Sequence, residues 1–232
     1  MNFTQIKKSV YFSAAIIITS ILFTACSNDD KKAIDESATA AATSEFKEGI
    51  HYKNLAGFTL STEQKTATLN TPKITEFFWY GCPHCQSFAP LLSDWSKNHS
   101  TVEVQYIPVI WNEVTETHAK IFFLIRDKDN FSELHKAMFE IVAGLSRTAD
   151  AEQHKASIIN QLNALGVPAS ETRNAINNDT YAKAMAAVLL DMKNYQVAGV
   201  PTLIVNNQYK VLNAKLTSMP QALSVAESLL KK

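Results

Sequence analysis

The sequence predicts an α/β fold with an inserted helical subdomain, and three features of the pattern indicate it. A strand, a turn, a helix and a second strand follow one another over residues 73–110. A pattern typical of helices then covers about residues 113–195, and the strand pattern resumes near residue 201. Because a helix joins the first two of these strands, we expect them to pair in parallel within one sheet.

The N-terminal segment is typical of an export signal. Two lysines precede an apolar run over residues 10–25, which is shorter than the roughly 20 residues that span a bilayer. The run ends in "LFTAC", which resembles the lipobox of bacterial lipoproteins, whose cysteine becomes the lipidated first residue. We therefore expect residues 1–25 to be a lipoprotein signal peptide and Cys26 to carry the lipid. An ordinary signal peptide with an incidental Cys26 is the alternative.

The segment after Cys26 differs in composition from the rest of the chain. Residues 27–45 are small and polar and contain no aromatic residue, so they cannot pack a core. We interpret residues 26–45 as the lipidated cysteine and a flexible tether, and residues 46–232 as the folded domain.

Composition narrows the possible functions. The 232 residues carry 22 Lys and Arg against 22 Asp and Glu, so the chain offers no basic surface for nucleic acid. Apolar residues make up 46% of the chain, which is enough for one substantial core. The sequence predicts a globular domain that does not bind nucleic acid.

The elements of the folded domain follow from periodicity and from turn signals. An aromatic run over residues 73–80 reads as a buried central strand, and Gly81 marks the turn after it. Apolar residues then recur at three and four residue intervals from Phe88 to Trp95, which indicates a helix. Further strands are expected over residues 49–55, 102–110, 201–207 and 208–213, a loop or edge strand over 59–70, and a closing helix over 220–232. Gly166 indicates a helix stop, and Asn206-Asn207 a turn between the last two strands.

Inside the inserted subdomain, "IFFLI" over residues 121–125 is too short to span a membrane, and we expect it in the core. The histidines of the subdomain and of the preceding loop share no common spacing, so each is expected to be a core or surface residue and not a ligand. These histidines are His99, His118, His135 and His154.

Cys82 and Cys85 are three residues apart where the strand passes into the helix, so their side chains share one face of the first helical turn. Free backbone N–H groups and the helix dipole favour a thiolate at Cys82. A structural disulfide would close a very small loop and constrain the unfolded chain little. A structural zinc site needs four ligands, and only His84 could join the two cysteines. A redox pair is the preferred interpretation, and the other two remain alternatives.

Three segments resemble the DsbA family of thiol:disulfide oxidoreductases, which belongs to the thioredoxin superfamily. "TEFFWYGCPHC", residues 75–85, is similar to the active-site segment of that family. "FKEGIHYKNL", residues 46–55, resembles its first strand, and "GVPTLIVNNQYKVLN", residues 199–213, resembles its cis-proline loop and hairpin. The resemblance covers residues 46–232 and implies a thioredoxin-like fold with the helical insertion at about residues 113–195.

The resemblance implies a role for each residue of the motif. Cys82 would be the exposed nucleophile, and Cys85 the buried partner that resolves mixed disulfides. Pro83 and His84 would be the dipeptide between them, with His84 stabilising the Cys82 thiolate by charge and hydrogen bonding.

Two further positions are implied by the same resemblance. Val200 and a cis Pro201 would form the loop that faces the cysteines, with the Val200 backbone presented to an extended substrate. Glu76 would be a buried carboxylate beneath the active site that exchanges protons with Cys85, although a water-exposed residue at a strand edge is the alternative. The lysine that usually accompanies this carboxylate has no counterpart in "WNEVTETHAK".

The expected function is donation of disulfides to reduced exported proteins by a monomer on the periplasmic side of a bacterial membrane, held there by the lipid on Cys26. The resemblance implies re-oxidation by a DsbB-like, quinone-linked membrane protein and requires no cofactor or metal. Three alternatives remain: an isomerase or reductase with the same chemistry, a metal-binding lipoprotein, and an adhesion or assembly lipoprotein that keeps only the fold.

Overall fold

The computed structural model describes residues 46–55, 71–145 and 150–232, all within one compact unit, Ser44–Lys232. The predicted signal peptide, Cys26 and the tether lie outside the described residues, as does the loop or edge strand expected over residues 59–70. Within the described ranges, no helix is long and apolar enough to cross a bilayer.

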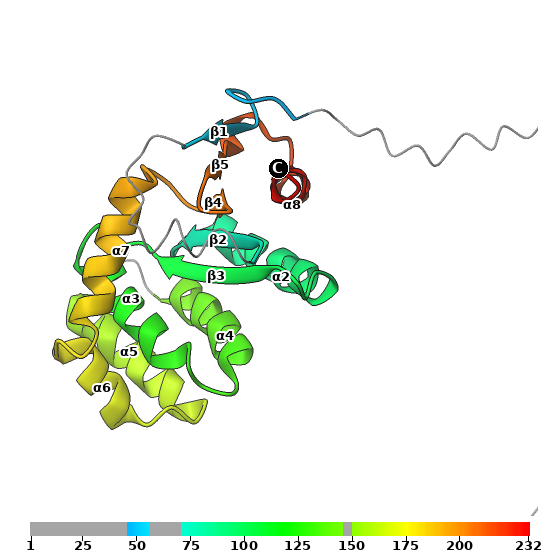
Figure 1. Ribbon diagram of the computed structural model, residues 1–232. Helices are drawn as coiled ribbons and strands as arrows, with labels where there is room; N and C mark the ends of the chain where they lie inside the picture. The colour runs from blue at the N-terminus through cyan, green and yellow to red at the C-terminus, as the bar shows by residue number, and fades with distance from the viewer. Residues whose placement is uncertain (1–45, 56–70, 146–149) are drawn as a thin grey trace, which may run out of the picture. The chain divides into compact units, whose positions relative to one another are not determined.

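The described elements alternate as the pattern predicts (Figure 1). The strands are β1 (Tyr52–Asn54), β2 (Lys73–Phe78), β3 (Glu103–Pro108), β4 (Thr202–Val205) and β5 (Tyr209–Val211). The helices are α2 (Pro83–Asn98), α3 (Glu113–Ile125), α4 (Phe131–Gly144), α5 (Ala151–Ala164), α6 (Ala169–Asn177), α7 (Ala182–Asn194) and α8 (Met219–Leu230), with a 3-10 turn η1 (Asn213–Lys215).

The strands form one mixed sheet in the order β1-β5-β4-β2-β3. The expected parallel pairing of β2 with β3 is confirmed, and the register places Glu76 opposite Tyr106. The pairs β2 with β4, β4 with β5, and β1 with β5 are antiparallel. The predicted turn between β4 and β5 is also confirmed, because Asn206 and Asn207 both have the positive φ that a tight hairpin requires.

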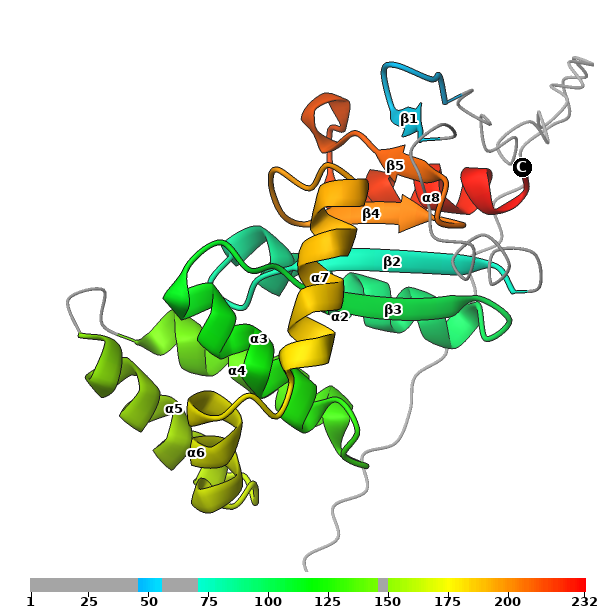
Figure 2. The same cartoon turned by 60° about the vertical axis from the view of Figure 1, so that its left-hand side comes forward.

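Strand β2 is central, and helices cover both of its faces. In Figures 1 and 2, α2 and α8 lie on one side of the sheet and α7 on the other. On the first side Ile74 packs in a core cluster with Phe88 and Leu92 of α2. On the second side the ring of Phe77 tilts against Tyr195, with ring centroids 5.8 Å apart. This burial on both faces explains why β2 reads as a continuous apolar run.

The inserted subdomain runs from α3 to α7, which matches the expected range of about 113–195. Asn112 caps α3 through a capping box with Thr115, and Asp150 caps α5 by accepting a hydrogen bond from the Gln153 N–H. Gly166 follows the end of α5 with φ of 89°, a conformation that favours glycine and explains the helix stop.

The interior of the insertion belongs to the same core cluster as Cys82, Cys85 and Phe77. The "IFFLI" segment lies in that core, as predicted, with Ile121 and Ile125 fully buried. His118 and His135 are also core residues. The predicted thioredoxin-like fold with a helical insertion is therefore confirmed.

Candidate active site

The active-site segment begins where β2 ends. Residues 79–81 form the turn, and Cys82, with extended backbone, is the N-cap of α2. Gly81 is required here by a close approach, because a Cβ at this position would lie 2.3 Å from Cζ2 of the Trp79 ring. The turn therefore places Cys82 at the N-terminus of α2, with the Trp79 indole folded back against Gly81.

The first turn of α2 is built to stabilise a thiolate on Cys82. The Cys82 sulfur accepts a hydrogen bond from the backbone N–H of Cys85 at 3.4 Å, and both cysteines are free thiols. The pKa of Cys82 is lowered from 9.0 to about 6, chiefly because the Cys85 thiol donates to it. Backbone N–H groups of Cys85 and His84 add to this effect, whereas partial burial opposes it. Cys82 is thus largely a thiolate at neutral pH.

Cys85 has the opposite character. Its side chain is fully buried, and its pKa is raised far above the ordinary value. The hydrogen bond that its thiol donates to Cys82 is the largest cause, followed by burial and by the nearby charge of Glu76. Two cysteines on one helical turn are therefore divided into a stable anion and a stable thiol.

The loop before β4 completes the site. The peptide bond between Val200 and Pro201 is cis, as expected, and the Cys82 thiol contacts the Val200 carbonyl oxygen at 3.6 Å. The expectation of an exposed Cys82 was wrong: the residue is only 8% exposed, because this loop lies against its sulfur. Cys82 is still more accessible than Cys85, which has no exposed surface.

Glu76 lies beneath the cysteines in the middle of β2. It is 1% exposed, so the structure favours the buried position over the strand edge, and its Oε1 has no hydrogen-bond partner among the described residues. Burial raises the pKa of this carboxyl well above its ordinary value, and the negative charge of the Cys82 thiolate raises it further. Both effects shift the equilibrium of Glu76 towards its protonated form.

The dipeptide between the cysteines lies at the surface. Pro83 occupies the first turn of α2, where a missing N–H costs no helical hydrogen bond, and both Pro83 and His84 are exposed. The charge of the His84 ring is the smallest of the named influences that lower the Cys82 pKa. The backbone N–H groups at the helix start therefore lower the Cys82 pKa more than the charge of this side chain does.

Sequence reasoning missed two hydrogen-bonded groups behind the site. The Tyr80 hydroxyl pairs with His135 Nδ1 at 2.8 Å, and both side chains are buried. The Trp79 indole N–H donates to His118 Nδ1 at 3.0 Å, and His118 Nε2 lies 3.0 Å from His154 Nε2. No sequence signal could have paired them, since their partners come from helices 36 to 55 residues away.

The described residues contain no group of three or more His, Cys, Asp or Glu side chains that could hold a metal ion. The site brings together two thiols, a nearby buried carboxyl and the cis-proline loop.

A family model described as thioredoxin matches residues 66–223, which is most of the folded domain and includes both cysteines and the cis-proline loop. The chain belongs to the thioredoxin family. Within it, the chain is a DsbA-type thiol:disulfide oxidoreductase.

Curated relatives agree with this assignment, and a solved structure agrees with the fold. The chain is 26% identical over 172 residues to the thiol:disulfide interchange protein DsbA of Burkholderia cepacia, covering 74% of this chain and 80% of the relative. It is 28% identical to DsbA of Pseudomonas syringae over 69% of this chain and 74% of that protein. The crystal structure of Pseudomonas aeruginosa DsbA superposes with a TM-score of 0.66 at 22% identity, over 80% of this chain and 93% of that one.

Proposed function

We propose that the enzyme donates disulfides to exported proteins through Cys82 and Cys85. The observation that carries this proposal is the geometry of the pair: Cys82 caps α2 with its sulfur 3.4 Å from the Cys85 N–H and 3.6 Å from the Val200 carbonyl oxygen, while Cys85 is fully buried. The lowered pKa of Cys82 and the raised pKa of Cys85 agree with it. A thiolate that is stable at neutral pH is a good leaving group and stabilises the reduced protein, so the disulfide form tends to give up its bond.

The transfer is a two-step exchange. A substrate thiolate attacks the Cys82 sulfur of the Cys82–Cys85 disulfide, which forms a mixed disulfide and releases the Cys85 thiolate. A second substrate thiolate then attacks the substrate sulfur of the mixed disulfide and releases Cys82 as a thiolate. The substrate loses two electrons and gains a disulfide. The enzyme takes up these two electrons, which reduce its disulfide to the separate sulfurs of Cys82 and Cys85.

Glu76 is proposed to supply the proton that Cys85 takes up. The Cys85 thiolate is unstable in its buried position, and Glu76 is close enough for the two charges to interact. Because burial holds the carboxyl protonated, it can give its proton to Cys85 and later recover one from water. The Val200 backbone beside Cys82 is proposed to hold an extended segment of the substrate during the exchange.

The decisive experiment is oxidation of a reduced two-cysteine peptide by the oxidised protein, together with the reduction potential against glutathione. We expect stoichiometric oxidation and a potential well above the about −270 mV of thioredoxin. Cys82→Ser and Cys85→Ser should each abolish the reaction, because neither variant can form the Cys82–Cys85 disulfide. When Cys85→Ser is instead mixed with an oxidised peptide, its Cys82 thiolate should form a mixed disulfide that persists, since no second enzyme thiol resolves it. A potential close to that of thioredoxin would instead support a reductase.

The role of Glu76 has its own test, which follows the release of Cys85 when a peptide thiolate attacks the oxidised enzyme. We expect Glu76→Gln to slow this step by about 10²-fold, the lower range for loss of a general acid, and to change its pH profile. A pH profile identical to that of the wild type would exclude the proton transfer, even if the rate fell.

We further propose that the enzyme is a monomer held on the periplasmic side of a bacterial membrane by a lipid on Cys26, and that a DsbB-like membrane protein re-oxidises it. The apolar run before Cys26 and the polar residues 27–45 support this location. Radiolabelled palmitate fed to cells should label the wild-type protein and not the Cys26→Ser variant. Equal labelling of the two proteins, or none in either, would exclude the lipid on Cys26.

A further inference from the structure

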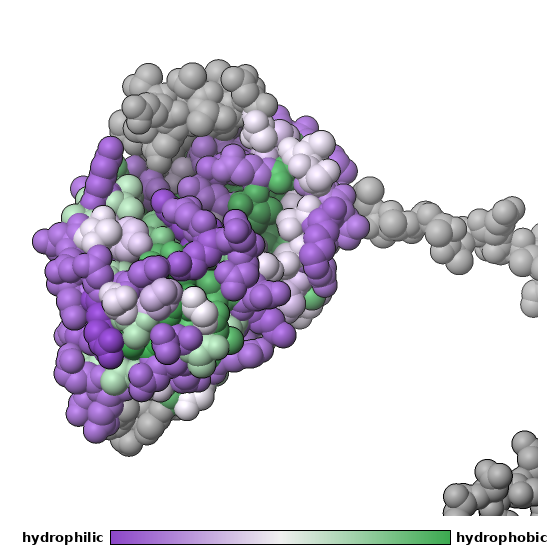
Figure 3. Space-filling model, turned by 90° about the horizontal axis from the view of Figure 1, so that it is seen from below, coloured by the Kyte–Doolittle hydropathy of each residue, from purple (hydrophilic) through white to green (hydrophobic). Residues whose placement is uncertain are grey.

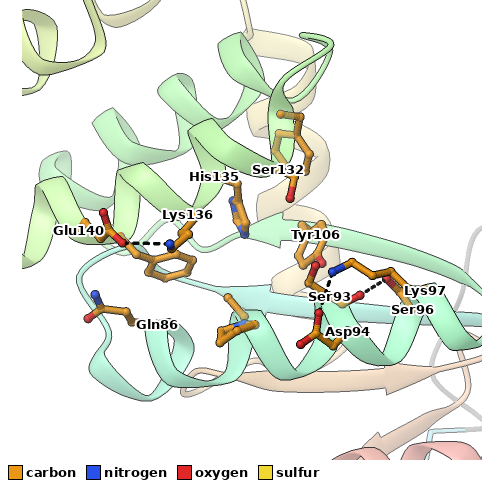
Figure 4. A pocket seen from close by; sticks show the side chains of 14 residues that line it. Gln86, Ser93, Asp94, Ser96, Lys97, Tyr106, Ser132, His135, Lys136 and Glu140 are labelled. Carbon is orange, nitrogen blue, oxygen red and sulfur yellow. Dashed lines mark hydrogen bonds and ion pairs between the residues drawn. The ribbon is translucent and has the colours of Figure 1, made fainter. Parts of the chain in front are cut away.

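A second site lies along α2, where that helix faces α4 across a cavity of about 670 Å³ (Figure 4). We call it the α2–α4 cavity. Its lining comes from α2 between Gln86 and Lys97, from Tyr106 of β3, and from α4 between Phe131 and Glu140. In the view from below, apolar surface is set back between hydrophilic residues (Figure 3). The volume is within the range of about 300–1,000 Å³ that is usual for small-molecule sites.

The wall of the cavity is aromatic and apolar. The rings of Tyr106, Phe131 and Phe139 contribute to the lining, together with Ala89 and Pro90 from α2. Such surfaces favour a flat apolar ring, which gains from burial and from offset or edge contacts with the aromatic side chains.

The charges around the cavity cancel in pairs. On α2, Lys97 lies 2.7 Å from Asp94, and on α4, Lys136 lies 3.7 Å from Glu140. Both pairs are drawn in Figure 4 and are solvent-exposed. Because each helix presents one cation beside one anion, the rim provides no net charge to attract an ionic ligand.

One buried polar atom at the cavity has no partner. His135 is 7% exposed, points from α4 into the space between α4 and α2, and lines the cavity (Figure 4). Its Nδ1 pairs with the Tyr80 hydroxyl, but its Nε2 is buried and unpartnered among the described residues. A buried polar atom without a hydrogen bond is unusual and unfavourable.

The tautomer of His135 follows from its partner. If the Tyr80 hydroxyl donates to Nδ1, the neutral ring carries its proton on Nε2, and only that N–H lacks a partner. If the Tyr80 hydroxyl instead accepted a hydrogen bond from Nδ1–H, two groups would lack a partner: the Tyr80 hydroxyl proton and His135 Nε2. The first arrangement leaves fewer buried groups unsatisfied, so Nε2 presents an N–H donor.

We propose that the α2–α4 cavity binds a small neutral molecule that combines an apolar ring with one carbonyl oxygen, and that this oxygen accepts a hydrogen bond from His135 Nε2. Since Nε2 is closed to water in the empty cavity, the tilted rings of Tyr106 and Phe131, with centroids 5.0 and 5.1 Å from that of His135, must part slightly to admit it. The lining includes none of Cys82, Cys85, Val200 or Pro201, so this proposal does not rest on the proposed function.

The test uses two probes of nearly the same shape, propiophenone and propylbenzene, which differ in the carbonyl group. Binding to the purified reduced protein is followed by NMR of the backbone amides and of the His135 ring nitrogens. We expect propiophenone to shift α2 and α4 amides and the His135 Nε2 signal, and to bind about tenfold more tightly than propylbenzene, the usual effect of one hydrogen bond. Equal affinities, shifts confined to the Cys82 loop, or no binding up to the solubility limit would each overturn the proposal.

Two matched variants place the site. Ala89→Phe puts a ring into the cavity, whereas Leu91→Phe puts the same ring on the same helix at an exposed position outside the lining. We expect the first to weaken propiophenone binding at least about tenfold and the second to leave it unchanged. Similar affinities in the two variants would overturn the proposal, and the amide spectrum of each confirms that it is folded.

Discussion

Helix α2 borders two regions that treat charge in opposite ways. At its first turn, backbone N–H groups and the Cys85 thiol surround the Cys82 sulfur and lower its pKa to about 6. Behind this turn, towards α4, burial lowers the pKa of His135 to about 3 and raises that of Tyr80, so both are neutral. All three side chains are buried, but hydrogen bonds to the Cys82 sulfur favour its charged form and outweigh burial, whereas burial decides the pKa values of His135 and Tyr80.

Glu76 shows what happens between these two extremes. It is as deeply buried as Tyr80 and lies beneath the cysteines, but no donor faces its Oε1 among the described residues. Glu76 therefore lies close to the two cysteines, but burial favours its neutral form, as it does for Tyr80 and His135. A carboxyl of this kind suits proton transfer better than charge stabilisation.

The largest expected effect is a pH-dependent gap in stability between the two redox forms. The Cys82 pKa is about 6 in the folded reduced protein and 9.0 as its reference value, so unfolding takes up a proton between these pH values. The reduced protein should therefore gain stability over the oxidised one as pH rises from 6 to 9, and lose it as pH falls through 6. The gain is at most about 4 kcal/mol and smaller where water screens the sulfur.

This gap is measured by urea unfolding of both redox forms across that pH range. The thiolate absorbance in the ultraviolet gives the midpoint independently. A stability difference that stays constant from pH 5 to 9 would show that the first turn of α2 does not stabilise the Cys82 thiolate. Cys82 would then not differ from the neutral pair Tyr80 and His135.

Gly81→Ala tests the turn that delivers Cys82 to the helix. The new Cβ would meet the Trp79 ring at 2.3 Å, and this ring is held by its hydrogen bond to His118. We expect a loss of about 1–3 kcal/mol in the free energy of unfolding. Gly199→Ala, on the loop that faces Cys82, is the control, because its Cβ would have no neighbour within 4 Å. Equal effects of the two substitutions would contradict the steric explanation.

A double-mutant cycle tests the buried hydrogen bond between Tyr80 and His135. Tyr80→Phe or His135→Phe alone leaves a buried polar partner unsatisfied and should cost about 1–3 kcal/mol. The double substitution removes both polar groups and adds a Phe ring among the aromatic neighbours, so it should be nearly neutral. Additive costs in urea unfolding would show that the pair is not coupled. None of the three variants should move the Cys82 thiolate midpoint.

The smallest effects are expected at the rim of the α2–α4 cavity. Lys97→Gln and Lys136→Gln each remove one member of an exposed ion pair, and such pairs contribute little. We expect each to change the free energy of unfolding by less than about 1 kcal/mol. A larger cost would mean that the rim charges support the fold, unlike the buried groups inside it.

Local sequence features were sufficient for most of the scaffold. The aromatic run of β2 predicted a central strand because both of its faces are buried, and the strand that follows α2 predicted parallel pairing. Gly166 and the Asn206-Asn207 pair predicted a helix stop and a hairpin, because their positive φ values are requirements of the local chain. Each of these predictions depends on residues close in sequence.

The site divides along the same line. The spacing of Cys82 and Cys85 and their place before a helix are local, so the pattern alone predicted that the two thiols share the first turn and that backbone N–H groups face Cys82. The cover over Cys82, the lack of a partner for Glu76, and the pairing of Tyr80 with His135 were decided only by tertiary structure. These contacts join residues up to 118 positions apart, and burial and hydrogen bonding across such distances depend on how the elements pack.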